Sequence, residues 1–482
     1  MRSSTLCVSE SNVSSVGDEL VGRAGESLVR AAWASDGTRR DFREFEAKLY
    51  ELANEAVRRQ LEIRLQQIAD EHAERLRIDG KLYRQHEAGE VDYHTLCGKV
   101  RVRRATYREV GVRNGATVVP LDLATGVIRQ ATPALAYSVA LGYAAGPMRH
   151  YEAQMKAAHR RPPPRATLER MASFIGGCAA QDVMKIENEI RRDESVPAEA
   201  HAISVSLDRT AVAMVEERPP GEPANSRRKR RIAPYVRSKP DPIDVNWRML
   251  YVGTVSLVDK SGEIIVTRKY HATPEEGPDE ITLRMMADLL HWKSEAELSV
   301  VVVQDGGPEM WNEIRDALRR TGVTDWIEVL DRYHLNERLS QVLQLVERES
   351  SARHKRFERW QRQLDADDKA IYRIRHWIDQ RAEALGRGQR WYELLGHTSY
   401  IYGYQRMMRY ASLRRRGLPI GSGAVEGACK SLVAMRAKRS GQRWRQDGLT
   451  AVLTLRALEQ SDRFMRFWRV YVNRFSANII AA

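Results

Sequence analysis

The feature that most constrains the fold is a continuous apolar run at 298–307, Leu-Ser-Val-Val-Val-Val-Gln-Asp-Gly-Gly. A strand with one face in water would alternate apolar and polar residues, whereas four valines in a row indicate burial on both faces. Such a strand needs helices on either side of its sheet and parallel neighbours within it. The run therefore predicts the centre of an α/β sheet.

The flanking segments predict the rest of this sheet. Alternating or apolar runs favour further strands at 203–214, 248–259, 264–273 and 326–334. Apolar residues at helical spacing favour helices at 279–292 and 309–320. The order β-β-β-α-β-α-β, followed by further helix, is that of a ribonuclease-H-like mixed sheet, with three meandering strands and then parallel strands joined by crossover helices. We expect an α/β catalytic core at 200–334, completed by residues 416–470.

The N-terminal part is expected to be mainly helical. Residues 1–40 are rich in Ser and Gly and predict a disordered tail. Residues 41–90 contain no Pro and favour one long amphipathic helix, which either packs on its own domain or forms a dimer zipper. Residues 91–195 predict a basic β-hairpin followed by helices of helix-turn-helix type, and the polar stretch 187–199 reads as a linker.

Several basic segments are candidate DNA contacts. The hairpin presents Arg101, Arg103 and Arg104 between apolar residues, and the following helical region contains Arg160 and Arg161. A long Pro-rich loop at 218–246 carries Arg227, Arg228, Lys229, Arg230 and Arg231. We interpret this loop as a flexible DNA-contacting arm, with a solvated charge run as the equal alternative. A plain helical bundle with a solvated face is the alternative for the helical region.

Residues 335–415 are expected to form an all-helical insertion. This segment is rich in aromatic residues, which favour the core of a helical domain over platforms for base stacking; they include Trp360, Trp377, Trp391, Tyr400 and Tyr404.

The charge distribution favours a nucleic-acid partner. The chain has 78 Lys and Arg against 64 Asp and Glu, a net charge of +14. Residues 401–482 contain 16 basic residues and four acidic ones, a net charge of +12. This part alone therefore supplies most of the net positive charge of the chain. Its candidate DNA contacts are Arg414, Arg415, Arg416, Lys438 and Arg439.

Other function classes have little support. The chain has four cysteines and no Cys-x-x-Cys, so neither a disulfide scaffold nor a thiolate zinc site is expected. No signal-peptide pattern or bilayer-length apolar run is present, and we expect a soluble, cytoplasmic, nucleoid-associated protein without a membrane partner. Glu426 occupies the third glycine position of a Gly-x-Gly-x-x-Gly loop, so no nucleotide cofactor is expected.

Three acids stand at positions suited to metal-dependent catalysis. Asp208 is expected to end the first strand and Asp305 to end the valine strand, and Glu426 begins a helix after Pro-Ile-Gly-Ser-Gly. The carboxyl ends of parallel strands meet at one sheet edge, and carboxylate oxygens suit Mg²⁺ or Mn²⁺. Two such ions serve in-line phosphoryl displacement. Each Asp taken alone is more often a turn or cap residue.

Three further residues are supporting candidates. Lys430 lies four residues after Glu426 and either steadies a phosphate or pairs with Glu426. Asp331 and His334 form an Asp-x-x-His element at the end of the last predicted strand. Metal ligation, proton relay and DNA positioning are open for this element, as is a structural role in which His334 caps the next helix. Ser422 is the expected N-cap of the Glu426 helix.

The chain resembles bacterial insertion-sequence transposases of the ISKra family, a DDE group related to the Mutator-like enzymes. The resemblance rests on Ser206-Leu207-Asp208, Asp305-Gly306-Gly307, Leu330-Asp331-Arg332-Tyr333-His334 and the long block from Gly421 to Lys430. It implies Asp208, Asp305 and Glu426 as the metal-binding triad, Asp331 and His334 as the element between the second and third acids, and an all-helical insertion before the glutamate.

The resemblance implies a Mg²⁺- or Mn²⁺-dependent DNA transposase with two ions. We expect it to bind the terminal inverted repeats of its element, to cleave there, and to transfer the freed 3′-hydroxyl to target DNA. Joining two ends requires two active sites, so a homodimer or larger assembly on double-stranded DNA is expected. Two alternatives are a ribonuclease-H-like structure-specific nuclease and a catalytically inactive, domesticated DNA-binding regulator.

Overall fold

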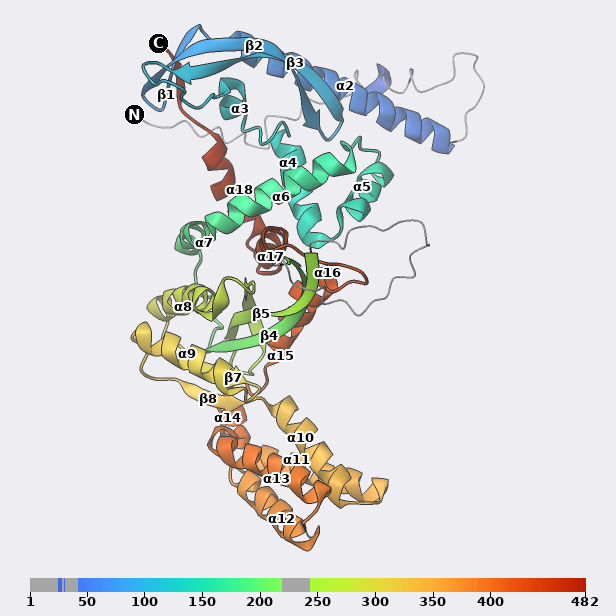
Figure 1. Cartoon of the computed structure of the whole chain (residues 1–482), viewed down its shortest axis with the longest axis vertical. Helices are drawn as coiled ribbons and strands as arrows, with labels where there is room; N and C mark the ends of the chain where they lie inside the picture. Colours follow the sequence, from blue (N-terminus) through green and yellow to red (C-terminus); the bar gives the residue numbers. More distant parts are fainter. Residues whose placement is uncertain (1–24, 28–29, 31–41, 219–242, 386) are drawn as a thin grey trace. The chain divides into compact units, whose positions relative to one another are not determined.

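The computed structural model describes residues 25–27, 30, 42–218, 243–385 and 387–482 (Figure 1). The predicted tail lies almost entirely outside these residues, and so does the basic cluster Arg227, Arg228, Lys229, Arg230 and Arg231. The chain divides into two compact units, one formed by Met1–Ala172 with Tyr471–Ala482 and the other by Ser173–Val470. Among the described residues, no helix combines the length and apolar character needed to cross a bilayer.

The first unit contains a four-stranded antiparallel sheet that the sequence analysis missed. Helix α2 (Phe42–Asp70) is followed by β1 (Arg75–Ile78), β2 (Lys81–Thr95) and β3 (Gly98–Glu109), and β9 (Ile479–Ala481) completes the order β3-β2-β1-β9. The prediction of one helix over 41–90 is therefore wrong beyond Asp70.

The error has a local cause. Asp79 and Gly80 adopt φ values of 48° and 82° and form the two-residue turn between β1 and β2. Asp-Gly at such a turn is a strong hairpin signal, and it outweighs the absence of proline. The basic strand β3 pairs with β2 along its whole length, and Tyr107 of β3 also forms an antiparallel bridge with Val118.

Helices account for the rest of the N-terminal half. They are α3 (Pro120–Thr125), α4 (Pro133–Ala145), α5 (Met148–Ala157), α6 (Arg165–Gln181) and α7 (Val183–Arg192). Gly146-Pro147 and Pro162–Pro164 fall between helices, where proline is tolerated. The linker expected at 187–199 is wrong, because it includes the end of α7 and the buried residues Glu187, Arg191 and Glu194.

The second unit is built on a mixed five-stranded sheet. Its strands are β4 (Ala202–Glu217), β5 (Ile243–Val258), β6 (Ile264–Ala272), β7 (Ser299–Gln304) and β8 (Ile327–Leu330), in the order β6-β5-β4-β7-β8. β4, β5 and β6 pair antiparallel, whereas β7 and β8 run parallel to β4. The predicted α/β class and order of elements are confirmed, although the last strand ends at Leu330 and not at His334.

Both faces of this sheet are covered. Val300 and Val302 pack in a core with α8 (Gly277–Glu295) and α9 (Pro308–Arg320). Val301 and Val303 pack in a second core with apolar residues of the helical segment after β8. The valine strand is therefore buried on both sides, as its composition predicts.

The helical insertion consists of α10 (Arg332–Val346), α11 (Ser350–Ala366), α12 (Ala370–Leu385), α13 (Gln389–Tyr404) and α14 (Tyr410–Arg415) (Figure 1). Trp360 is buried at the centre of its core, and Trp377, Trp391, Tyr400 and Tyr404 pack against that core. The aromatic residues thus serve as core, as predicted.

The remaining chain returns to the sheet. Helix α15 (Gly423–Ala428) packs on β5 and β4 and continues as a π-helix, Cys429–Ala434, and then as α16 (Met435–Ala437). Helices α17 (Gln446–Gln460) and α18 (Phe464–Val472) follow. A π-helical turn within an α-helix is frequent at functional sites, and this one begins three residues after Glu426.

Candidate metal centre at the carboxyl ends of the central strands

Three aspartates lie level with one another on three neighbouring strands. Asp305 and Asp331 directly follow the ends of β7 and β8, whereas β4 continues beyond Asp208 to Glu217, so the prediction that Asp208 ends its strand is wrong. In the parallel pair β4–β7, Val205 is opposite Val302, and Asp208 and Asp305 each follow three residues later. In the pair β7–β8, Gln304 is opposite Leu330, and Asp305 and Asp331 each follow one residue later. The Leu207 amide donates to Oε1 of Gln304 at 3.1 Å and links the first two strands at this level.

Asp331 connects three elements through one carboxylate. Its Oδ2 accepts hydrogen bonds from the His334 amide at 2.8 Å and from the His334 ring Nδ1 at 2.9 Å. Its Oδ1 accepts from the Ser422 amide at 2.6 Å, directly before α15. The end of β8, the first turn of α10 and the start of the Glu426 helix are therefore fixed to one buried side chain.

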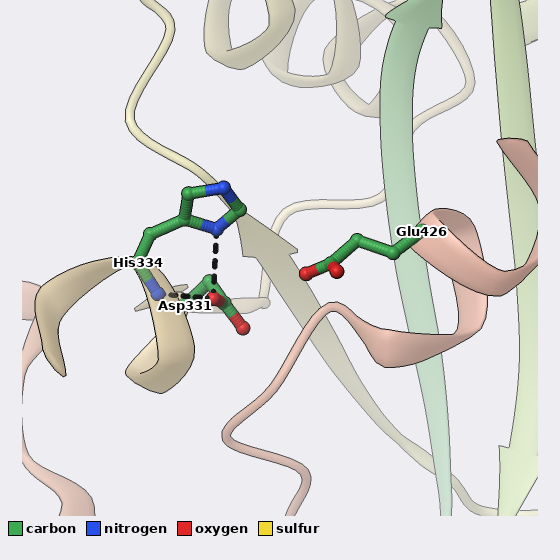
Figure 2. A group of neighbouring side chains, drawn as sticks. All are labelled: Asp331, His334 and Glu426. Atoms are coloured by element: carbon green, nitrogen blue, oxygen red, sulfur yellow. Dashed lines mark hydrogen bonds and ion pairs between the residues drawn. The ribbon is translucent and has the colours of Figure 1, made fainter. Parts of the chain in front are cut away.

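Glu426 completes a compact group with these residues. The ligand atoms of Asp331, His334 and Glu426 all lie within 4.8 Å of one another, and Figure 2 shows the Glu426 carboxylate pointing toward the other two side chains. Ser422 Oγ donates to Glu426 Oε1 at 3.2 Å. Two oxygen donors and one imidazole at this spacing fit a divalent cation.

The charges of the site act on one another. The hydrogen bond that its ring donates to Asp331 raises the pKa of His334 to about 9, and the negative charges of Asp305 and Glu426 add to this effect. Burial opposes ionisation of Asp331, but its hydrogen bonds from His334 and from the backbone lower its pKa. Without a cation, the raised pKa keeps the His334 ring protonated at neutral pH, and the ring offsets part of the acidic charge; a bound cation would have to displace this proton, because only neutral imidazole is a ligand.

Asp208 reaches the same region from β4. The Cys429 thiol donates to its Oδ2 at 3.3 Å. Burial raises the pKa of Cys429 well above its ordinary value, and the charges of Asp208 and Glu426 act in the same direction. Asp208 thus lies against the helix that carries Glu426, and this thiol remains protonated.

The predicted residues are brought together in part. Asp208, Asp305 and Glu426 come to one end of the sheet, but in the described part of the chain the close group is Asp331, His334 and Glu426. The metal-binding role of the predicted trio stays a prediction. Asp331, and not His334, caps α10.

Two details of the Glu426 helix differ from expectation. Ser422 occupies the N-cap position, but its hydroxyl bonds Glu426 and makes no capping hydrogen bond to the backbone. Lys430 is exposed, and no ion pair with Glu426 is found among the described residues. Lys430 lies in the π-helix, where residues four apart no longer stack as they do in an α-helix.

The predicted DNA contacts of the N-terminal region are partly engaged within the chain. Arg101 pairs with Asp92 at 3.0 Å, and Arg104 donates to the Tyr93 hydroxyl at 3.0 Å, whereas Arg103 is exposed. Arg160 donates to Asn54 at 3.3 Å, and Arg161 pairs with Glu55 at 3.1 Å. Acidic residues on β2 and α2 therefore neutralise part of the basic hairpin.

The C-terminal candidates are more accessible. Arg414, Arg415 and Arg416 are exposed at the end of α14, and only Arg414 has an acidic neighbour among the described residues, Asp365 at 3.7 Å. Lys438 hydrogen-bonds the Thr210 hydroxyl on β4, and Arg439 Nε donates to the Met435 carbonyl at 2.7 Å. Both side chains are exposed. Thr210 lies two residues after Asp208, and Met435 directly follows the π-helix.

Sequence reasoning missed the residues that hold the Asp305 turn. The hydroxyls of Tyr400 and Tyr404 donate to the carbonyls of Asp305 and Gly306 at 2.6 and 2.5 Å. Both tyrosines were expected only as core of the insertion, and no spacing in the sequence links them to a turn almost 100 residues away.

A scan of protein-family models gives no match to this chain, and no curated protein is significantly similar to it.

Proposed function

We propose that this chain is a metal-dependent DNA transposase that cleaves the ends of a mobile element and joins the freed 3′-hydroxyl to target DNA. The observation that carries the proposal is the set of level carboxylates Asp208, Asp305 and Asp331 on adjacent strands, with Glu426 facing them from α15. The strand order β6-β5-β4-β7-β8 agrees with a ribonuclease-H-like core, in which acids at this edge serve phosphodiester chemistry.

The donor set fits the proposed cofactor. Carboxylate oxygens are the ligands that Mg²⁺ and Mn²⁺ prefer, and crowded carboxylates repel one another unless cations join them. When bound by Asp208, Asp305 and Glu426, two divalent ions supply activation of the attacking oxygen and stabilisation of the leaving oxygen. Asp331 orients α15 through Ser422, and His334 offsets negative charge beside the acids.

The charge distribution supports a DNA substrate. The exposed Arg415 and Arg416, with Lys438 and Arg439 near β4, supply positive charge in the same unit as the acids. Phosphate contacts of this kind bind DNA without reading its sequence. The partners we propose are the terminal inverted repeats and target DNA, bound by a homodimer or larger assembly.

The test is a set of single replacements that keep side-chain size, Asp208→Asn, Asp305→Asn and Glu426→Gln. The substrate is linear DNA carrying the genomic sequences that flank the gene, with Mg²⁺ or Mn²⁺. Loss of a side chain that only orients a metal ligand typically lowers metal affinity or activity by about 10–100-fold. Loss of a ligand itself is therefore expected to reduce both cleavage and joining by more than about 100-fold. DNA binding in a gel-shift assay should persist.

Asp325→Asn is the matched control, because Asp325 is exposed two residues before β8, at the opposite end of this strand from Asp331. It should retain full activity. Wild-type protein that cuts without joining would identify a nuclease instead. Wild-type protein that binds the DNA but neither cuts nor joins would identify a regulator, and either result contradicts the proposed function.

A further inference from the structure

Tyrosine hydroxyls from the helical insertion hold the ends of the two strands that carry Asp305 and Asp331. Tyr400 and Tyr404 on α13 donate to the carbonyls of Asp305 and Gly306. Tyr410, at the start of α14 and fully buried, donates to the Leu330 carbonyl at 2.9 Å. The ladder between β7 and β8 ends at Gln304 and Leu330, so all three bonds lie at or beyond its last pair.

The turn after Asp305 is shaped to receive these hydroxyls. Gly306 has a φ of 94°, and a Cβ at this position would lie 2.6 Å from the Tyr400 hydroxyl oxygen. Both the backbone conformation and the close approach therefore require glycine here. The amide of the next residue, Gly307, donates to Asp305 Oδ1 at 2.9 Å. The carbonyls that the tyrosines hold thus belong to the same turn that orients the Asp305 carboxylate.

The two rings are themselves fixed by packing. The Tyr400 and Tyr404 ring centroids are 5.1 Å apart, and the guanidinium carbon of Arg338 on α10 lies 4.2 Å from the centroid of the Tyr400 ring. A cation at this distance over an aromatic face is attracted to it. Helices α10 and α13 therefore present the hydroxyls from a rigid frame, which is what orientation of a carboxylate requires.

We infer that Tyr400 and Tyr404 are positioning residues for Asp305, so that the helical insertion forms part of the active centre. The inference rests on the proposed function for its catalytic meaning, but the contact itself is independent of it. Groups that orient a metal ligand typically change metal affinity or activity 10–100-fold when they are lost. The insertion thereby controls the direction of a carboxylate that lies outside its own helices.

The test is the double variant Tyr400→Phe/Tyr404→Phe, which removes two hydroxyls and keeps both rings. Tyr402→Phe on the same helix is the control, because Tyr402 is 65% exposed. Hydrogen exchange of the Gly307 amide reports on the turn directly, and isothermal titration with Mn²⁺ reports on the centre without DNA. Faster Gly307 exchange and an approximately 10–100-fold weaker Mn²⁺ affinity are expected in the double variant only.

A kinetic readout separates positioning from general stability. The double variant should lose kcat for DNA cleavage with little change in KM for DNA, and high Mn²⁺ should restore part of the rate. Unchanged Gly307 exchange or unchanged Mn²⁺ affinity overturns the inference. Wild-type protein that binds Mn²⁺ but does not act on DNA overturns the proposed function alone, since the exchange and titration results then still support the positioning role. Wild-type protein that binds no Mn²⁺ overturns both.

Discussion

A network of buried charges lies in the second unit. Arg463 is 2% exposed and donates to Asp288 at 2.5 and 3.0 Å and to Glu194 at 3.0 Å. Asp288 also accepts from Arg191 at 3.1 Å, and Glu194 accepts from Arg268 at 2.9 Å. A pair of this kind is strongly destabilised when one partner is removed, because the other charge is left buried without compensation.

We expect Arg463→Met to lower the free energy of unfolding by about 3–5 kcal/mol. Urea denaturation followed by circular dichroism measures the change. Arg469→Met is the control, because Arg469 is exposed on the neighbouring helix α18, and it should alter stability by less than about 0.5 kcal/mol. Equal effects of the two replacements would contradict a dominant role for the buried network.

The same network predicts an acid dependence. Burial opposes ionisation of Glu194 and Asp288, but pairing with Arg463 outweighs it and lowers both pKa values below their ordinary range. A lowered pKa in the folded state gives stability above the ordinary pKa of about 4, and this stability is lost as the pH falls below it. The difference between wild type and Arg463→Met should therefore shrink from pH 7 to pH 3. If the difference in unfolding free energy stayed constant with pH, Glu194 and Asp288 would not be the residues through which Arg463 stabilises the fold.

At the scale of elements, α2 protects the edge of the N-terminal sheet. β3 is an edge strand, and its Arg101 and Arg103 amides donate to Glu62 and Gln66 at 3.2 and 2.9 Å. The Gln66 amide group also donates to the Arg103 carbonyl at 3.0 Å. Side chains of a helix thus occupy backbone groups that an uncovered edge would offer to another chain.

Gln66→Ala removes two of these bonds. Each typical hydrogen bond contributes about 0.5–1.5 kcal/mol net, so a loss of about 1–2 kcal/mol in the first unit is expected. Hydrogen exchange of the Arg103 amide should accelerate. Gln60→Ala on the same helix is the control. Gln60 is exposed, and its replacement should leave the exchange rate of the Arg103 amide unchanged. Unchanged exchange at Arg103 would show that Gln66 does not cover this edge.

The two sheets differ in how far the sequence predicts them. β7 was recognisable because Val300 to Val303 are buried on both faces. β2 was not, since most of its residues from Arg84 to Glu90 are exposed and show no alternation. The gathering of acids near one level of the sheet could be predicted from the parallel order of the strands. The hydrogen bonds of Asp331 to His334 and Ser422, and that of Tyr400 to the Asp305 carbonyl, could not, because they depend on tertiary contacts between distant segments.

At the scale of the whole molecule, positive charge is concentrated in one part of the chain. Residues 401–482 carry a net charge of +12 out of +14. Arg414, Arg415 and Arg416 are the densest exposed cluster of that part among the described residues. Binding that depends on such charges weakens with salt because each phosphate contact releases condensed counterions.

Replacing Arg414, Arg415 and Arg416 by Ala should weaken DNA binding and flatten its salt dependence. The slope of log Kobs against log salt changes by about 0.9 for each phosphate contact that is lost. The triple variant Lys355→Ala/Arg359→Ala/Arg362→Ala removes the same charge from the exposed face of α11 and serves as control. An unchanged slope in the first variant, or equal slopes in both, would place the arginine cluster off the DNA path.

The pairing of β1 with β9 has a consequence for the order of assembly during translation. Leu76 and Ile78 lie opposite Ala481 and Ile479 in this antiparallel pair, about 400 residues later in the chain. At synthesis rates of about 5–20 residues per second, β1 waits roughly 20–80 s for its neighbour. The second unit is contiguous and can fold on the ribosome in that interval. We therefore expect the N-terminal sheet to be the last part to close, with the β1 edge of a nascent chain lacking its β9 neighbour until then.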